Sequence, residues 1–226
     1  FNDHCWLNSM ETPSSPGNIS PIASFLAESS RKFKGFMETE TDERRVHLVI
    51  GNEAADADSV VSAITYAYFL SEKALEQSPA LIVPMVSIPR SEFFMRQETV
   101  MLLKKAGVCE STVLFGDEVD LAKLGDLCGL GGGGAESSSS SSSTGPGRLR
   151  LTLVDHNCLS ADKRFLDQCV LEVVDHHQDL GEYPWVSGGQ RDIAFSGSGA
   201  LVGSCCTLVA EKFLSEMPSA VDATLA

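Results

Sequence analysis

Short apolar runs alternate along this chain with segments whose apolar residues recur at helical spacing. The run HLVIG, at residues 47–51, precedes a helix-like segment at 59–73, and LIVPMVSI, at 81–88, precedes another at 93–106. The runs LRLTLV and LEVV follow, and a last helical segment spans 202–213. Strands and helices in this order predict a doubly wound α/β fold, with helices covering both faces of a mainly parallel sheet.

Two segments lack this regular pattern. Residues 1–44 mix Pro, Ser, Asn and Gly, so we predict an irregular, loosely packed arm with a short helix around residues 22–33. Residues 129–147 read GLGGGGAESSSSSSSTGPG, a Gly- and Ser-rich insertion with almost no apolar side chain to bury. We therefore expect one domain over residues 45–226, interrupted by this insertion.

Charge and cysteine content narrow the expected partners and compartment. The chain of 226 residues has 31 acidic and 17 basic residues and a net charge of −14, which argues against nucleic-acid binding through basic phosphate contacts. Its 7 cysteines, an odd number without CxxC spacing, predict reduced thiols in a cytoplasmic protein. No apolar run approaches the about 18 residues that a membrane span needs. We therefore expect no membrane insertion.

Acidic and imidazole side chains gather directly after three of the predicted strands. The sequence GNEAADADS follows the first strand, DHN begins at Asp155, and DHH begins at Asp175. The carboxyl ends of parallel strands meet at one edge of a sheet, so these groups are expected to converge. Carboxylates with imidazoles suit Mn²⁺ or Mg²⁺ better than a metal selected by thiols. Taken alone, Asp56 and Asp58 fit a helix cap and a dipole partner better than a metal site, but three coinciding clusters favour a metal centre.

The motifs GNEAADADS, LVDHN and VVDHH resemble the first three motifs of the DHH phosphoesterase superfamily. The longer runs GNEAADADSVVSAITYAY and IVPMVSIPR resemble its eukaryotic exopolyphosphatase and prune branch. Many superfamily members have histidine where Asn52 stands, although the exopolyphosphatase-like branch has asparagine. The resemblance implies two divalent cations, Mn²⁺ or Mg²⁺, bound by side chains of these motifs: Asn52, Asp56, Asp58, Asp155, Asp175, His176 and His177.

The resemblance also implies an activity. The expected enzyme is a metal-dependent phosphoanhydride hydrolase, which attacks inorganic polyphosphate or another small phosphate substrate with a hydroxide activated by two metals. His176 and His177 are the implied catalytic residues, because an imidazole of the DHH pair can orient or protonate the leaving phosphate. Asp175 is implied to be partly a ligand and partly a residue that orients imidazole.

Other residues are predicted to bind the substrate phosphates. Arg90 is the first choice for neutralising them and Arg96 the second. An ordinary surface arginine is an equal alternative for Arg90 and the favoured one for Arg96. The glycine-rich SGSGALVGS is predicted to bring backbone N–H groups, at Gly203 and Ser204 in particular, close to phosphate at a helix N-terminus.

Two functional alternatives stay open, and one expected motif is absent. The same site would suit a cyclic-nucleotide phosphodiesterase, and the same fold a weakly active or inactive regulatory interaction protein. The family's fourth-motif aspartate is not evident before Ala226, and neither is its second, substrate-covering domain. We therefore expect a shortened chain with weak metal binding and weak activity. If it were instead as active as a longer chain, Asp192 or Asp222 would be the nearest carboxylate to complete the metal shell.

Overall fold

The computed structural model describes residues 20–39, 43–74, 80–130 and 148–218. Residues 131–147 of the predicted insertion lie outside this part of the chain, as does Asp222. Among the helices of the described residues, none combines the length and the apolar character that a membrane crossing requires.

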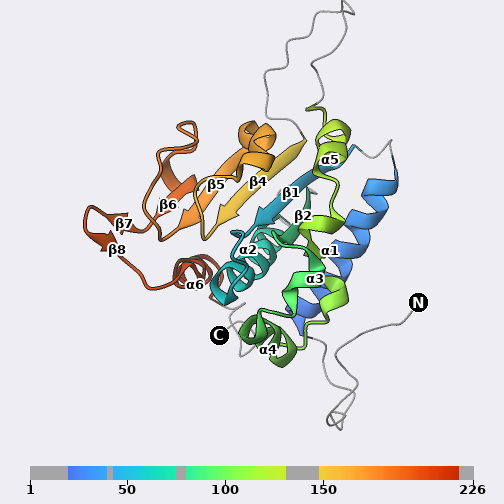
Figure 1. Ribbon diagram of the computed structural model, residues 1–226, viewed down its shortest axis with the longest axis horizontal. Helices are drawn as coiled ribbons and strands as arrows, with labels where there is room; N and C mark the ends of the chain where they lie inside the picture. Colours follow the sequence, from blue (N-terminus) through green and yellow to red (C-terminus); the bar gives the residue numbers. More distant parts are fainter. Residues whose placement is uncertain (1–19, 40–42, 75–79, 131–147, 219–226) are drawn as a thin grey trace, which may run out of the picture.

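The centre of the fold is a six-stranded sheet in which every pair of neighbouring strands runs parallel. The strand order is β3-β2-β1-β4-β5-β6, and β7 and β8 form a separate antiparallel hairpin (Figure 1). The order runs outward in opposite directions from β1 and from β4, so the switch point lies between these two strands. The predicted doubly wound parallel sheet is confirmed. The strands are β1 (Arg45–Ile50), β2 (Ala80–Val86), β3 (Leu114–Phe115), β4 (Leu149–Val154), β5 (Val170–Asp175), β6 (Arg191–Ile193), β7 (Phe195–Ser196) and β8 (Gly199–Ala200).

Helices cover both faces of this sheet (Figure 1). Successive side chains of a strand point to opposite faces, so they divide between two hydrophobic cores. Val49 and Val174 belong to the core that contains α2 and α6, whereas Leu48 and Val173 belong to the core that contains α5 and η3. The helices are α1 (Pro21–Glu38), α2 (Ala57–Ala74), α3 (Arg90–Phe93), α4 (Gln97–Lys105), α5 (Leu121–Leu127) and α6 (Cys205–Glu216), with 3₁₀ helices η1 (Glu110–Thr112), η2 (Gly116–Glu118), η3 (Ala161–Cys169) and η4 (Gly188–Gln190).

Two predicted elements differ from the structure in detail. The helix expected at residues 93–106 is divided into α3 and α4, because Arg96 leaves helical geometry at ψ 62°. The apolar run that contains Pro84 does form strand β2. Since β3 pairs only with Met85 and Val86, the part of β2 around Pro84 has a strand neighbour on one side only, where proline is tolerated.

The N-terminal arm is the clearest difference. The prediction of a loosely packed arm at residues 1–44 is wrong for α1, an 18-residue helix that contains the predicted short helix. Ser20 caps α1, because its Oγ accepts a hydrogen bond of 3.3 Å from the backbone N–H of Ala23. Proline follows at the first helical position, where its missing N–H has no cost.

Helix α1 packs into both hydrophobic cores. Ile22 and Leu26 are buried beside α2, and Phe33 and Phe36 are buried in the core on the other face. The buried face of α1 is hard to recognise in the sequence, because its positions also include small polar residues such as Ser29. The Ser29 hydroxyl donates to the carbonyl of Leu26, and this bond satisfies it inside the protein.

Replacing Phe36 with leucine is expected to lower the free energy of unfolding by about 1 kcal/mol, since a fully packed ring is replaced by a smaller side chain. Urea-induced unfolding followed by circular dichroism measures this difference. The matched control is Phe94→Leu, because the Phe94 ring is exposed and its replacement should change stability little. Equal effects of the two substitutions would show that α1 does not pack as described.

Candidate metal centre

The centre lies at the carboxyl ends of β1, β4 and β5, beside the switch point of the sheet. Asn52 comes two residues after β1, Asp155 follows β4 directly, and Asp175 is the last residue of β5. These three strands are hydrogen-bonded neighbours, which explains why motifs far apart in the sequence meet here. The expected convergence therefore takes place at one edge of the sheet.

Asp155 is the buried carboxylate of the centre, with only 2% of its surface exposed. Its Oδ2 accepts a hydrogen bond of 2.8 Å from Asn52 Nδ2. Its Oδ1 is buried and has no hydrogen-bond partner among the described residues. Burial raises the pKa of Asp155 to about 7, and the negative charges of Asp58 and Asp56 add to this effect. A bound cation would both pair with this oxygen and restore the ordinary ionisation of the carboxyl group.

The imidazole of His176 faces the unpartnered oxygen. Its Nε2 lies 3.2 Å from Asp155 Oδ1 and 3.5 Å from Asp58 Oδ2, while its Nδ1 lies 3.3 Å from the carbonyl oxygen of Val202. If Nδ1 carries the proton and donates to Val202, the Nε2 lone pair points toward two carboxylates. Lone pairs and negative charges in this arrangement require a proton or a metal ion between them.

His177 completes a group with the spacing of metal ligands. One ligand atom each from Asp155, His176 and His177 lies within 4.8 Å of the other two. The His177 side chain is 55% exposed, and its Nδ1 lies 2.8 Å from Asp175 Oδ1. Desolvation disfavours the charged ring, but the hydrogen bond and the charge of Asp175 outweigh it and raise the pKa of His177. The residues present therefore fit a divalent cation bound by oxygen and nitrogen.

Asp175 supports both histidines rather than facing the centre itself. It is fully buried, and its Oδ1 accepts from the backbone N–H groups of His176 and His177 at 2.8 and 3.2 Å. Its Oδ2 accepts a hydrogen bond of 2.6 Å from Asn157 Nδ2. These bonds, with the one to the His177 ring, fix the orientation of the imidazoles. The orienting part of the implied role is the part that this geometry supports.

Asn157 is a site residue to which the sequence analysis gave no role. Besides Asp175, its amide binds the carbonyl oxygen of Gln178 at 3.0 Å and the backbone N–H of Leu180 at 3.0 Å. It thereby ties the loop after β4 to the loop after β5. Its place in the motif LVDHN was the available signal, but its partners become visible only in the folded chain.

Asn52 and Asp56 hold structural positions at the start of the first loop. The Asn52 Oδ1 accepts from the backbone N–H groups of Ala54 and Ala55, and its Nδ2 donates to Asp155, so neither end of the amide is left for a cation. In this structure Asn52 supports Asp155, and its role as a direct ligand stays a prediction. Asp56 is exposed and caps α2, since its Oδ1 accepts from the backbone N–H of Ser59 at 3.0 Å.

Asp58 lies against the N-terminus of α6, 147 residues along the chain from its partner Cys205. Its carboxylate accepts from the Ser204 hydroxyl at 2.7 Å and from the backbone N–H groups of Cys205 and Cys206, each at 2.9 Å. Burial opposes ionisation of Asp58, but these hydrogen bonds outweigh it and lower its pKa. The side chain of Asp58 thus lies at this helix end, and phosphate binding by Gly203 and Ser204 stays a prediction.

Replacing Asp58 with alanine is expected to destabilise the protein by about 1–2 kcal/mol, because α6 loses the anion that caps its first turn. Chemical denaturation measures the change in the free energy of unfolding. Glu211→Ala is the matched control, since Glu211 is an exposed acidic residue of the same helix. A loss no larger than that of the control would contradict the capping role.

The two arginines predicted to bind phosphate have different surroundings. The Arg90 guanidinium contacts both carboxylate oxygens of Glu118, at 2.6 and 2.8 Å, and the carbonyl oxygens of Glu110 and Val113. Each of its nitrogens thus has a protein partner, as in an arginine that holds the fold together, and substrate binding by Arg90 stays a prediction. Arg96 instead donates from Nε to the carbonyl of Ala54 at 2.6 Å, so it reaches the first loop of the centre.

Asp192 does not complete the centre. It lies on β6, and its Oδ2 forms an ion pair of 3.1 Å with Lys212 Nζ of α6. This ion pair accounts for its place at the edge of the sheet, outside the group of Asp155, His176 and His177.

A doubly wound parallel sheet with a buried aspartate and a histidine pair at its switch point defines the class of protein. The chain belongs to the DHH family, since its residues 47–225 match the N-terminal domain of that family. Among curated proteins, it is 35% identical to exopolyphosphatase PRUNE1 of Bos taurus over 182 residues and 34% identical to the Homo sapiens protein of that name over 181. A putative exopolyphosphatase of Schizosaccharomyces pombe is 32% identical over 179 residues.

These matches confirm the predicted likeness to the exopolyphosphatase and prune branch. They cover 80% of this chain for the two PRUNE1 proteins and 77% for the yeast protein. The chain spans 34% of the length of each PRUNE1 protein and 38% of the yeast protein, or about a third of these relatives.

Proposed function

We propose that this chain is the DHH domain of a metal-dependent phosphoanhydride hydrolase that releases phosphate from inorganic polyphosphate. The observation that carries the proposal is the buried, unpartnered Oδ1 of Asp155, which lies 3.2 Å from His176 Nε2. The names of the relatives, which call them exopolyphosphatases, support this choice of substrate. The site residues are Asp155, His176 and His177, with Asp56 and Asp58 at its border and Asp175 behind it.

Asp155, His176 and His177 would hold the cation, and Mn²⁺ and Mg²⁺ both suit this mixture of oxygen and nitrogen. A divalent cation bound there would lower the pKa of a water molecule that it binds and would polarise phosphoryl oxygens. Asp155 loses its proton when a cation binds, because its raised pKa of about 7 keeps a large part of it protonated at neutral pH in the free protein. Metal affinity should therefore fall as the pH is lowered below 7.

The chain's own residues fix the direction of the two imidazoles. Asp175 holds the Nδ1 edge of His177 and the backbone of both histidines, which fixes the direction of the rings. The exposed His177 ring, whose pKa is raised, carries a proton in a larger fraction of molecules near neutral pH than an ordinary histidine does. Once its Nε2 holds a cation while Nδ1 donates to Asp175, the ring has no proton to give, so His177 would act by orienting the phosphate through the bound cation.

Phosphate release from tripolyphosphate and from long-chain polyphosphate, measured with Mn²⁺ or Mg²⁺, tests this function. We expect release that requires the metal, that stops on addition of a chelator, and that is lost in Asp155→Asn. The matched control Asp120→Asn removes the same charge from the N-cap of α5 and should retain the activity. Hydrolysis of cyclic nucleotides but not of polyphosphate would assign the site to a phosphodiesterase, and metal binding without any hydrolysis would favour an interaction protein.

A further inference from the structure

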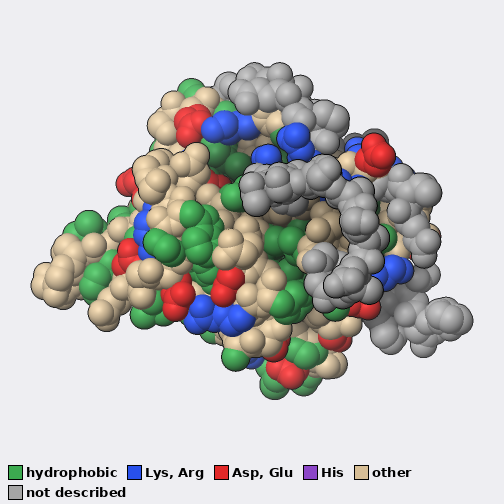
Figure 2. Space-filling model, turned by 90° about the horizontal axis from the view of Figure 1, so that it is seen from above, with side chains coloured by type: hydrophobic (Ala, Val, Ile, Leu, Met, Phe, Trp, Pro, Cys, Tyr) green, Lys and Arg blue, Asp and Glu red, His purple; other side chains and the backbone are tan. Residues whose placement is uncertain are grey.

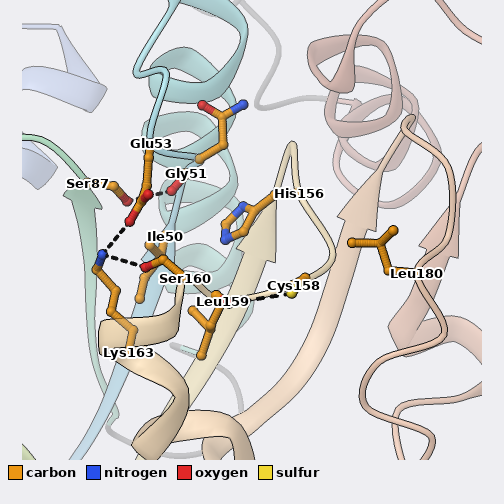
Figure 3. Close-up of a pocket in the computed structure, with 11 residues that line it drawn as sticks. Ile50, Gly51, Glu53, Ser87, His156, Cys158, Leu159, Ser160, Lys163 and Leu180 are labelled. Carbon is orange, nitrogen blue, oxygen red and sulfur yellow. Dashed lines mark hydrogen bonds and ion pairs between the residues drawn. The ribbon is translucent and has the colours of Figure 1, made fainter.

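An open pocket of about 330 Å³ adjoins the metal centre on the side of β2 and η3. Asn52, whose amide holds Asp155, lines this pocket, and so does His156, the residue after Asp155. Figure 3 shows the His156 ring on one side and the side chains of Lys163 and Glu53 reaching toward each other on another. The pocket and the centre therefore share the loops that follow β1 and β4.

Lys163 is the cation of this pocket, and it is unusually well buried. Its side chain is only 11% exposed, whereas the side chains of its acidic partners Glu53 and Asp162 are 57% and 73% exposed. The Lys163 Nζ lies 2.7 Å from Glu53 Oε1, 3.0 Å from Ser160 Oγ and 3.3 Å from Asp162 Oδ2. The cation is held in place by burial, while its anionic partners extend into solvent.

This unequal burial makes the acidic partners replaceable. An ion pair whose carboxylate is exposed contributes little to stability, so an incoming anion with more charge can displace that carboxylate. Lysine binds phosphate as a point charge and needs no fixed fork geometry. The Ser160 hydroxyl accepts from Lys163 at 3.0 Å and hydrogen-bonds the carboxylates of Glu53 and Asp162, so it can donate to an anion at the same position. Glu53 thus occupies the place that an anion would take.

Lys163 supplies the positive charge that the pocket itself presents. The net charge is −14, and Figure 2 shows basic and acidic side chains interspersed, without one continuous basic surface on the face drawn. Arg90 is fully committed to the protein's own oxygens. Lys163 is the one lysine or arginine among the residues that line the pocket. A polyanion that extends from the metal centre into this pocket would meet Lys163 there, while Arg96 reaches the loop after β1.

We propose that Lys163 and Ser160 form a subsite for a phosphate group of the substrate that is not itself cleaved, and that Glu53 fills this subsite until the substrate displaces it. The inference rests on the proposed function, which it deepens by assigning the remainder of the phosphate chain to this pocket. Such a subsite would also explain why the protein would prefer linear phosphate chains over substrates with a single phosphate.

The subsite predicts opposite effects for the two members of the ion pair. Lys163→Gln should weaken tripolyphosphate binding about tenfold, because a charged hydrogen-bond donor is lost. Glu53→Gln should strengthen binding several-fold, because a competing carboxylate is removed. Lys73→Gln is the control, since Lys73 forms an ion pair of 2.6 Å with Glu216 at the far end of α2. If the ion pair were purely structural, tripolyphosphate binding would instead weaken in both Lys163→Gln and Glu53→Gln.

Calorimetric binding of tripolyphosphate in the presence of a chelator tests the subsite without any turnover. Binding that follows the predicted opposite signs supports the subsite even if no variant releases phosphate, in which case only the proposed hydrolase function fails. Equal binding by wild type, Lys163→Gln and Glu53→Gln, or no binding by wild type, overturns the subsite. With metal present, the Michaelis constant for tripolyphosphate should rise in Lys163→Gln and fall in Glu53→Gln, and an unchanged constant in both would also overturn it.

Discussion

Asp155→Asn is expected to stabilise the metal-free protein by about 1–3 kcal/mol, the range of cost for leaving a buried polar atom without a partner. The new amide would keep the hydrogen bond from Asn52 through its oxygen and would donate from its nitrogen to His176 Nε2. The backbone should not resist the change, because φ at Asp155 is 62°, a conformation that asparagine tolerates well. The variant also removes a negative charge that burial and neighbouring carboxylates disfavour.

The stabilisation should depend on pH in a defined direction. The pKa of Asp155 is about 7 in the folded chain and lies above its ordinary value of 3.8, so the wild type binds more protons folded than unfolded between these values. The contribution of Asp155 to the stability of the wild type is fully present below about pH 4 and is lost as the pH rises through 7. The advantage of Asp155→Asn should therefore grow from pH 4 to pH 7 and then level off.

The same substitution should remove metal binding. We expect Mn²⁺ affinity to fall by more than about 100-fold, since loss of an outer-shell partner alone costs about 10–100-fold. Thermal unfolding with and without Mn²⁺ measures both effects, because a ligand stabilises only the protein that binds it. Wild type should gain stability from Mn²⁺, whereas Asp155→Asn should be stable and unresponsive. A variant that responds to Mn²⁺ like the control Asp120→Asn would rule out Asp155 as a ligand.

Asp175→Ala is expected to destabilise the protein by about 3–5 kcal/mol, the usual loss when one member of a buried charged network is removed. The backbone N–H groups of His176 and His177 and the amide of Asn157 would all lose their acceptor. A drop in melting temperature on the order of 10 °C follows for a domain of this size.

Metal binding provides a second measurement for Asp175. With the rings no longer held, Mn²⁺ affinity should fall about 10–100-fold under conditions where the variant is still folded. Asp175→Asn is the informative comparison, because asparagine has the shape of aspartate and its one side-chain oxygen can still accept from the backbone N–H groups of His176 and His177. An Asp175→Ala protein with wild-type melting temperature and reduced metal affinity would mean that Asp175 is a ligand and not a support.

The sheet and its metal centre could be predicted because their signals are local. An apolar run followed by Asp and His identifies a strand and its carboxyl end, and parallel packing brings such ends together whatever their separation in the sequence. The motifs alone therefore indicate that Asp155, His176 and His177 lie together. Asn157, which ties the loops after β4 and β5, is not identified by these rules, because its partners meet it only in the folded chain.

The partners of individual polar groups could not be predicted in this way. Asp58 binds the N-terminus of α6, and Arg90 binds Glu118, through contacts between segments that only the folded chain brings together. The sequence shows a carboxylate or a guanidinium but not which donor or acceptor it meets. For the same reason, Asn52 was assigned to a cation when its amide is used to hold Asp155.

The backbone at the centre also limits how the site can be altered. Ala55 and Asp155, with φ of 48° and 62°, are left-handed residues in the loops after β1 and β4. At Asp155, asparagine and glycine are the replacements that suit this backbone, and both lack a negative charge. A change there must give up either the loop conformation or the carboxylate. Adjustment of the centre by evolution or by design is therefore confined to exposed neighbours such as Asp56, whose capping role serine, threonine or asparagine can also fill.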